Sequence, residues 1–150
     1  MKVFVEVEIQ GSKEAIWKST TDIENSHQMI SGIHKIEVLE KPETGFIGFK
    51  WRETRTMFGK EATEVMWVTE VEENKGYKTR AESHGAIYIS SFTIEEKEDH
   101  CLLTMGFESE AVSLGGKLMD TLFGRMMKKS TEKELMKDLV DIKAFVEKGN

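Results

Sequence analysis

The chain has 150 residues, of which 39% are hydrophobic and 32% charged, and its formal net charge is −6. These values predict one soluble domain over residues 1–150, and the negative charge disfavours nucleic-acid binding. No apolar run is long enough for a membrane span, and the alternating N-terminus is unlike a signal peptide, so we expect a cytoplasmic protein without stable membrane insertion. The single cysteine, Cys101, excludes an internal disulfide and a multi-cysteine zinc site.

The N-terminal third predicts a strand, two short helices and a second strand. Residues 2–10 alternate between apolar and polar side chains, which is typical of a half-buried strand. Ser12 is a good cap for a short helix, and Asp22 is expected to cap a second one that ends at Met29. Residues 33–41 read as a strand, and residues 42–45, which contain the only proline, as a turn.

Five further strands, separated by short turns, are predicted over residues 46–57, 61–72, 77–83, 86–97 and 101–111. Short turns between successive strands favour an antiparallel meander. The first of these strands is the most informative, because its apolar face also carries Glu53 and Arg55 into the interior. Residues 61–72 are apolar on both faces, so their register is ambiguous, and we favour Ala62, Glu64, Met66 and Val68 as the inward set. Residues 77–83 alternate, with Tyr77, Thr79, Ala81 and Ser83 on one face. The other residues expected to face inward are Ile47, Phe49, Trp51, Glu53, Arg55, Met57, Tyr88, Ser90, Phe92, Ile94, Leu103, Met105 and Phe107.

Residues 115–148 predict one long helix, about 45 Å at 1.5 Å per residue, that can cover the apolar face of the sheet. Its apolar residues form two stripes on nearly opposite sides of a straight cylinder, so we expect a bend near Gly124. Its charged residues are interpreted as a solvated face with i,i+4 pairs, or, for Arg125, Lys128 and Lys129, as a contact to an anionic ligand head or lipid surface. The first stripe is Leu118, Met119, Leu122, Phe123, Met126 and Met127; the second is Leu135, Leu139, Ile142 and Val146.

This order of elements defines an α+β class, with a curved antiparallel sheet of about seven strands, two short helices after the first strand and a long C-terminal helix. The chain resembles the SRPBCC superfamily of helix-grip proteins, which includes START lipid-transfer domains, the major birch-pollen allergen and polyketide cyclase/dehydrases. The resemblance implies a sheet wrapped around the helix, with a hydrophobic cavity between them for lipids, polyketides or other apolar molecules. The sequence differs from the family pattern at Met29, where many relatives have tryptophan. The matching segments are Ala15-Ile16-Trp17, residues 21–25, residues 30–33, Arg52-Glu53-Thr54-Arg55, Gly59-Lys60 and residues 135–147.

We therefore expect a ligand site on the inner sheet face and the first helix stripe. Apolar pockets with a few polar groups are the usual composition of small-molecule sites. The predicted lining is Trp51, Glu53, Arg55, Met57, Met66, Tyr88, Phe92, Met105, Leu118, Leu122 and Met126.

Glu53 and Arg55 allow two interpretations, since buried charges are costly unless they are paired. In one, they form an ion pair at the cavity edge, with Glu64 of the next strand as a further member. In the other, Arg55 holds a ligand carboxylate or phenolate and Glu53 holds a ligand donor.

Three functions are compatible with these patterns. The leading one is a non-enzymatic binder or carrier of a small hydrophobic molecule, as a monomer or homodimer. The second is a cyclase/dehydrase-like lyase or a hydrolase, with Glu53 or Glu64 as base and Arg55 stabilising negative charge. The third is a partner-binding module like the chaperone-activating branch of the superfamily, with an exposed apolar patch around Trp67.

The four histidines do not suggest a catalytic or metal site. His84 is a candidate general base, but its place in a predicted turn indicates a surface residue. His27, His34 and His100 are scattered without metal-ligand spacing, so we predict no metal and no cofactor.

Overall fold

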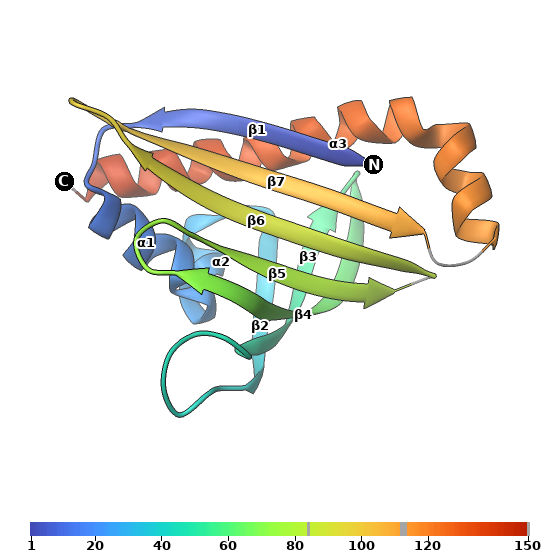
Figure 1. The fold of residues 1–150 in the computed structure, drawn as a ribbon, viewed down its shortest axis with the longest axis horizontal. Coiled ribbons are helices and arrows are strands. Elements are labelled where there is room, and N and C mark those ends of the chain that lie inside the picture. The colour runs from blue at the N-terminus through green and yellow to red at the C-terminus, as the bar shows by residue number, and fades with distance from the viewer. Residues whose placement is uncertain (84, 112–113, 150) are drawn as a thin grey trace.

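The computed structural model describes residues 1–83, 85–111 and 114–149, and the side chains of residues 1–83, 85–111 and 127–149. Seven strands form one antiparallel sheet in the order β1-β7-β6-β5-β4-β3-β2 (Figure 1). No helix among these described residues is long and apolar enough to cross a membrane. The elements are β1 (Lys2–Ile9), α1 (Lys13–Thr21), a 3-10 helix (Ile23–Asn25), α2 (Ser26–Met29), β2 (Ile33–Glu40), β3 (Lys50–Met57), β4 (Lys60–Glu72), β5 (Gly76–Ser83), β6 (Ala86–Glu96), β7 (Cys101–Ala111) and α3 (Leu114–Lys148).

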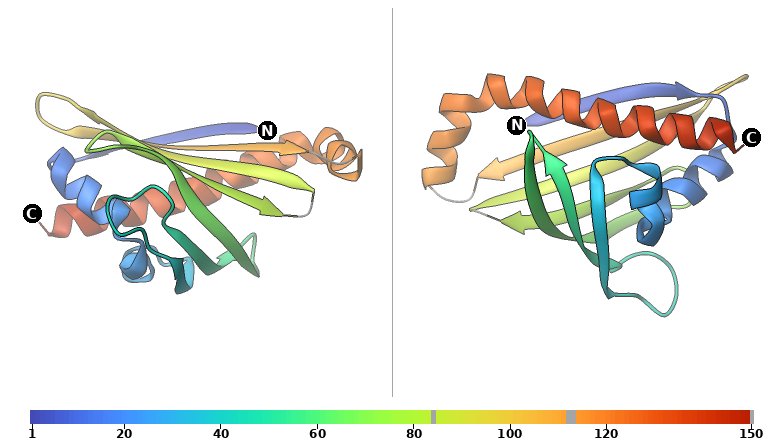
Figure 2. Two further views of the ribbon diagram at one scale, coloured as in Figure 1. Left: turned by 60° about the horizontal axis from the view of Figure 1, so that its bottom comes forward. Right: turned by 180° about the vertical axis from the view of Figure 1, so that it is seen from behind.

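This architecture confirms the predicted helix-grip arrangement. Strands β2 to β7 follow one another as an antiparallel meander, and β1 pairs with β7, so that β1 and β2 are the two edges. The sheet curves strongly, and α1, α2 and α3 all lie on its concave side (Figure 2). The concave face is therefore the one on which a core and a ligand site can be built.

Two local predictions were wrong. Residues 46–49 do not belong to β3, because Gly48 has a left-handed φ of 90° that interrupts the extended backbone, and Ile47 is 58% exposed instead of facing inward. Asp22 does not cap a helix through its side chain; its carboxylate accepts two hydrogen bonds from the Asn25 side chain, at 3.0 and 3.1 Å. The segment after it starts as a 3-10 turn, and α2 is a single turn.

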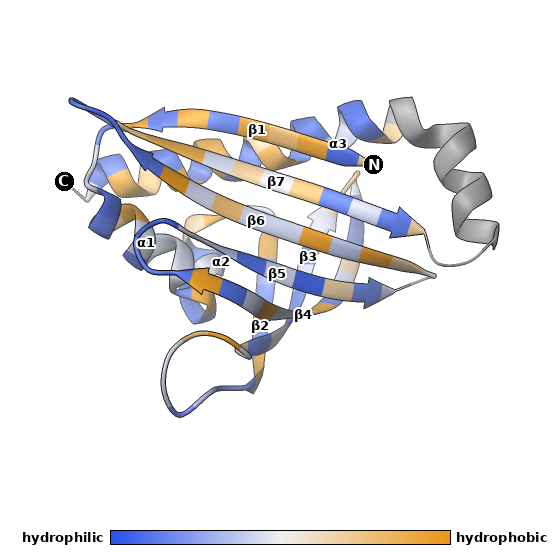
Figure 3. Ribbon diagram, in the orientation of Figure 1, coloured by the Kyte–Doolittle hydropathy of each residue, from blue (hydrophilic) through white to orange (hydrophobic). Residues whose placement is uncertain are grey.

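The main core lies between the second apolar stripe of α3 and strands β1 and β7. All four residues of that stripe are buried, and Leu139 and Ile142 have no exposed surface. Hydrophobic and hydrophilic residues alternate along β1 (Figure 3). Val3 and Ile9 are buried, whereas Phe4 is 57% exposed. The buried members of this core are Val3, Ile9, Ile16, Ile30, Ile33, Ile94, Cys101, Leu103, Met105, Leu135, Leu139, Ile142 and Val146.

A second core joins α1 and the 3-10 helix to the middle of the sheet. It contains the buried side chains of Ile23, Phe49, Trp51, Val68 and Tyr77. The Tyr77 hydroxyl donates a 2.7 Å hydrogen bond to the carbonyl of Thr20. This bond satisfies a buried polar group and fixes the end of α1 on β5.

The first apolar stripe of α3 and the bend predicted near Gly124 fall largely in residues 112–126, whose side chains lie outside the described part of the structure. Met127, the last residue of that stripe, is 42% exposed. The packing of α3 on the sheet is therefore described from residue 127 onward.

Candidate ligand-binding site

Burial on the concave face of β6 and β7 decreases toward the ends of the strands that carry Tyr88 and Phe107. In β6, Ile94 is 7% exposed, whereas Tyr88, six residues earlier and on the same face, is only half-buried. In β7, Leu103 is fully buried, whereas Phe107 is half-buried. The concave sheet surface around Tyr88 and Phe107 is therefore apolar and accessible, and this surface is termed the hollow (Figure 2).

Aromatic and methionine side chains line this accessible end. The rings of Tyr88 and Phe107 stack with centroids 5.7 Å apart and an interplanar angle of 25°. Met66 on β4 lies directly opposite Trp51 on β3, and both Met66 and Met57 are half-buried. These are the soft, adaptable surfaces that accommodate apolar molecules.

Other residues of the predicted lining fall elsewhere. Trp51 and Met105 are buried, at 3% and 6% exposure, and belong to the two cores. Phe92 packs between these cores, with its ring 5.2 Å from that of Tyr77. Leu118, Leu122 and Met126 lie outside the described side chains, so their place in the site stays a prediction.

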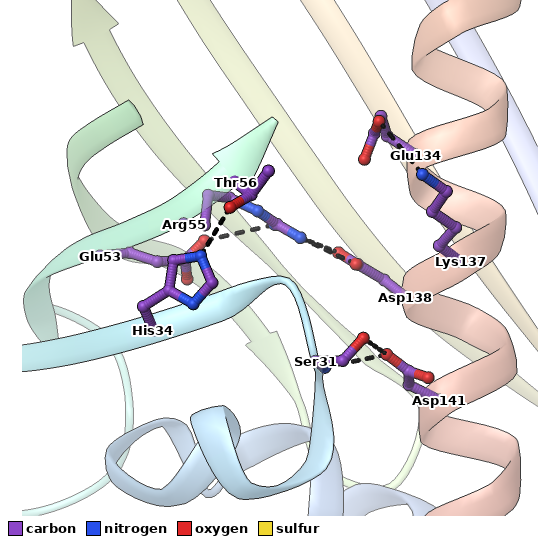
Figure 4. Close-up of polar contacts among 9 residues, drawn as sticks. All are labelled: Ser31, His34, Glu53, Arg55, Thr56, Glu134, Lys137, Asp138 and Asp141. Atoms are coloured by element: carbon purple, nitrogen blue, oxygen red, sulfur yellow. Dashed lines mark hydrogen bonds and ion pairs between the residues drawn. The ribbon is translucent and has the colours of Figure 1, made fainter. Parts of the chain in front are cut away.

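Arg55 connects the sheet to α3 beside this hollow (Figure 4). Its Nη2 donates to both carboxylate oxygens of Asp138, each at 2.8 Å, and its Nη1 donates to Oε2 of Glu53 at 3.3 Å. Glu53 and Asp138 are 7% and 5% exposed. The Nε atom of Arg55 is buried and has no hydrogen-bond acceptor. The structure thus contains the Glu53–Arg55 ion pair and adds a third member from α3.

Asp138 was missed by the sequence analysis, which placed it on the solvated face of the helix. The pattern did contain a signal: Asp138 stands three residues after Leu135 and four before Ile142, within the buried stripe. An acidic residue in an apolar helix stripe, in a chain with an inward arginine, predicts a buried ion pair.

One guanidinium therefore serves two buried carboxylates. Burial raises the pKa of Glu53, opposed by the charge of Arg55 and by a 3.3 Å hydrogen bond from Nε1 of Trp51. Burial also raises the pKa of Asp138, again opposed by Arg55. Because Asp138 accepts two 2.8 Å charge-assisted bonds and Glu53 accepts longer ones, we infer that Glu53 takes up a proton before Asp138 does.

This assignment predicts a pH-dependent stability difference between the wild type and a Glu53→Gln variant. The folded-state pKa of Glu53 is raised, so its contribution to stability is present below its unfolded pKa and is lost as the pH rises through the folded pKa. Glutamine does not titrate. Urea unfolding between about pH 4 and about pH 8 should show the variant gaining stability relative to wild type as the pH rises. A difference that is independent of pH would contradict the raised pKa.

Glu64 faces Glu53 across the β3–β4 pair but does not join the ion pair. Its carboxylate accepts a hydrogen bond from the Ser83 hydroxyl at 3.2 Å, and the side chain is half-buried. The charge of Glu64 adds to burial in raising the pKa of the Tyr88 phenol. Glu64, Ser83 and Tyr88 thus bring polar groups to the accessible part of the concave face.

The histidines contribute nothing to this group among the described residues. His34 bonds to the Thr56 hydroxyl at 2.6 Å on the exposed edge of the sheet, and His100 bonds to Asp99 at 2.6 Å. His84 lies outside the described residues.

A second hollow, of about 890 Å³, lies at the opposite ends of β5 and β6, around the β4–β5 turn. Phe92 is the one predicted ligand residue on its lining. Its surface carries both acidic and basic side chains, including Glu70, Glu72 and Lys75. The lining also contains the apolar and aromatic side chains of Val71, Tyr77, Phe92 and Ile94, so it combines a charged rim with an apolar part.

Comparisons with known proteins agree with this architecture. A family model described as "Polyketide cyclase / dehydrase and lipid transport" matches residues 1–141. A search of curated proteins finds no match.

Several solved structures share the fold. A START superfamily protein from Mycobacterium smegmatis has a TM-score of 0.83 at 20% identity, covering 99% of both chains. The Zhui aromatase/cyclase from Streptomyces sp. R1128 has a TM-score of 0.77 at 15% identity, covering 99% of this chain and 94% of that one. Major latex-like protein 151 from Panax ginseng has a TM-score of 0.75 at 13% identity, covering 97% and 96%. Since the family model matches nearly the whole chain and the helix-grip fold is the expected one, the chain belongs to the polyketide cyclase/dehydrase and lipid transport family.

Proposed function

We propose that the protein binds a small hydrophobic molecule on the accessible end of its concave sheet face. The observation that carries this proposal is the half-burial of Tyr88 on β6 and Phe107 on the adjoining strand β7, together with that of Met66 on β4, all of which face inward. Other inward residues, such as Ile94, Leu103 and Met105, are buried to below 10% exposure, so these apolar side chains are left accessible on the concave face. The family description, which names lipid transport, supports the same function.

A second candidate is a cyclase or dehydrase that uses the same hollow, and one observation favours it. Glu53 is a buried carboxyl with a raised pKa, held beside a guanidinium, which is an arrangement suited to general acid–base chemistry. A ligand has little access to the Glu53 carboxylate, however, because its two oxygens already accept hydrogen bonds from Trp51 and Arg55. Glu64 is the more accessible carboxylate and is the better base for a bound molecule.

The partner-binding hypothesis predicts an exposed apolar patch, for example around Trp67. Trp67 is half-buried, and Nζ of Lys50 lies 5.7 Å from its ring centroid. A cation over an indole face covers part of that surface. We therefore favour the ligand-binding function.

A Ser90→Leu substitution should block the hollow without damaging the fold. Ser90 is half-buried on the concave face and pairs with Phe107 of β7 and Thr79 of β5. Added volume in a filled core destabilises by about 1–3 kcal/mol, whereas added volume in an open hollow does not. We expect unchanged thermal stability together with a loss of at least about tenfold in affinity for Nile red, an uncharged hydrophobic dye.

The matched control is Thr93→Leu, on the exposed outer face of the same strand. This variant should bind the dye like the wild type. The proposed site would be refuted if Ser90→Leu lost stability, as overpacking of a filled core does. It would also be refuted if this variant bound the dye like the wild type. A wild-type protein that binds neither the dye nor any apolar compound from a lipid extract would refute the function.

A further inference from the structure

The charges on the concave face indicate which class of molecule the hollow accepts. We propose that Glu64 determines specificity, so that the site selects neutral or cationic molecules carrying a hydrogen-bond donor and rejects carboxylates. This inference rests on the proposed ligand-binding function. It reverses one interpretation of the sequence, in which Arg55 anchored a ligand anion.

Arg55 is the one basic residue among the described inward-facing positions of the sheet, and it is already neutralised. Its guanidinium contacts two carboxylates, and its side chain is 16% exposed. A ligand anion would have to displace Asp138 from a two-point contact in which both distances are 2.8 Å. Charge-assisted hydrogen bonds are stronger than neutral ones, and Nη1 is already bonded to Glu53, so we infer that the guanidinium is not available to a ligand.

Glu64 adds negative charge that no described cation compensates. Its described hydrogen-bond partner is a neutral hydroxyl, that of Ser83 at 3.2 Å. The side chain is half-buried, which leaves part of it open to a bound molecule. Even with Glu53 protonated, the group formed by Glu53, Arg55, Asp138 and Glu64 is negative overall.

The surroundings of Glu64 make this charge effective. Its field reaches the Tyr88 phenol, whose ring stacks on Phe107 and forms the apolar wall of the hollow. In such a partly desolvated place, like charges repel more strongly than in water, and a carboxylate accepts hydrogen bonds but donates none. A hydroxyl or ammonium group can donate to Glu64, whereas a ligand carboxylate cannot.

Three molecules with one decyl chain test this selectivity: decanol, decylamine and decanoate. Each would compete with Nile red at about pH 7.5, where the amine is cationic and the acid is ionised. We expect decanol and decylamine to bind at least about tenfold more tightly than decanoate, with the amine equal to or tighter than the alcohol.

The Glu64→Gln variant removes the charge and keeps the size of the side chain. It should reduce the difference between decanol and decanoate by at least about fivefold, because decanoate no longer meets a like charge. Glu61→Gln, at an exposed position of the same strand, changes net charge by the same amount and should leave the difference as in the wild type.

The outcomes separate this inference from the function on which it rests. Decanoate binding as tightly as decanol to the wild type would overturn the selectivity and leave the ligand-binding function standing. Selectivity that survives in Glu64→Gln would overturn the role of Glu64. Failure of Nile red and all three decyl compounds to bind would refute the proposed function itself.

Discussion

Replacing Arg55 with methionine should lower the free energy of unfolding by about 3–5 kcal/mol, because it leaves Glu53 and Asp138 buried without a cation. Methionine keeps most of the side-chain volume, so the loss reports the charge rather than a cavity. Urea unfolding at neutral pH measures the effect. The loss should shrink in acid, where protonation neutralises the two carboxylates.

Arg52→Met is the matched control on the same strand. Arg52 points to the opposite face, its side chain is 43% exposed, and it pairs with Glu37 at 3.3 Å. An exposed pair of this kind contributes about 0–1 kcal/mol. A loss for Arg55→Met as small as that of the control would contradict the buried ion-pair network.

A double variant, Arg55→Met with Asp138→Leu, distinguishes a missing cation from general damage. Since the second change removes one of the uncompensated carboxylates, the double variant should be more stable than Arg55→Met alone. Additive destabilisation would mean that the two side chains do not act together.

Leu139→Ala should destabilise the protein by about 2–5 kcal/mol, the range for deleting a large buried aliphatic side chain. Leu139 has no exposed surface and lies in the centre of the α3 stripe that packs against β1 and β7. Its removal would leave a cavity between the helix and the sheet, and chemical denaturation would measure the loss.

The adjacent residue provides the control. Val140 is 52% exposed on the other side of α3, and alanine is the better helix former, so Val140→Ala should be neutral or slightly stabilising. Equal losses at the two positions would indicate a helix that does not pack through Leu139.

Much of the fold could be predicted because strand alternation repeats over long runs. The inward faces of β6 and β7 follow directly from a period of two, and the buried stripe of α3 follows from a period near 3.6. Residues 46–49 failed this procedure because they continue the alternation while Gly48 takes a backbone conformation closed to other residues. The alternation of apolar and polar residues reflects side-chain chemistry and carries no information on the backbone angle φ.

The candidate site was only partly predictable, since it depends on contacts between distant segments. Glu53 and Arg55 share a strand face and could be paired from their spacing, whereas the contact from Arg55 to Asp138 joins residues that are 83 positions apart. Trp51 and Met105 were expected in the lining because they face inward, yet the depth at which α1 and α3 bury that face is a tertiary property. Alternation identifies which side chains share a face of the sheet. It does not identify where along that face the packing against the helices ends.

Because β1 pairs with β7, the sheet cannot be completed during translation until β7 has been synthesised. Lys2 lies opposite Glu108, so the first strand has no neighbour in the sheet until more than 100 residues have been made. Its inner face further requires the stripe from Leu135 to Val146, which is synthesised last. Such distant pairing makes folding slow, and during translation it leaves β1 as an unpaired apolar strand that must be kept from other nascent chains.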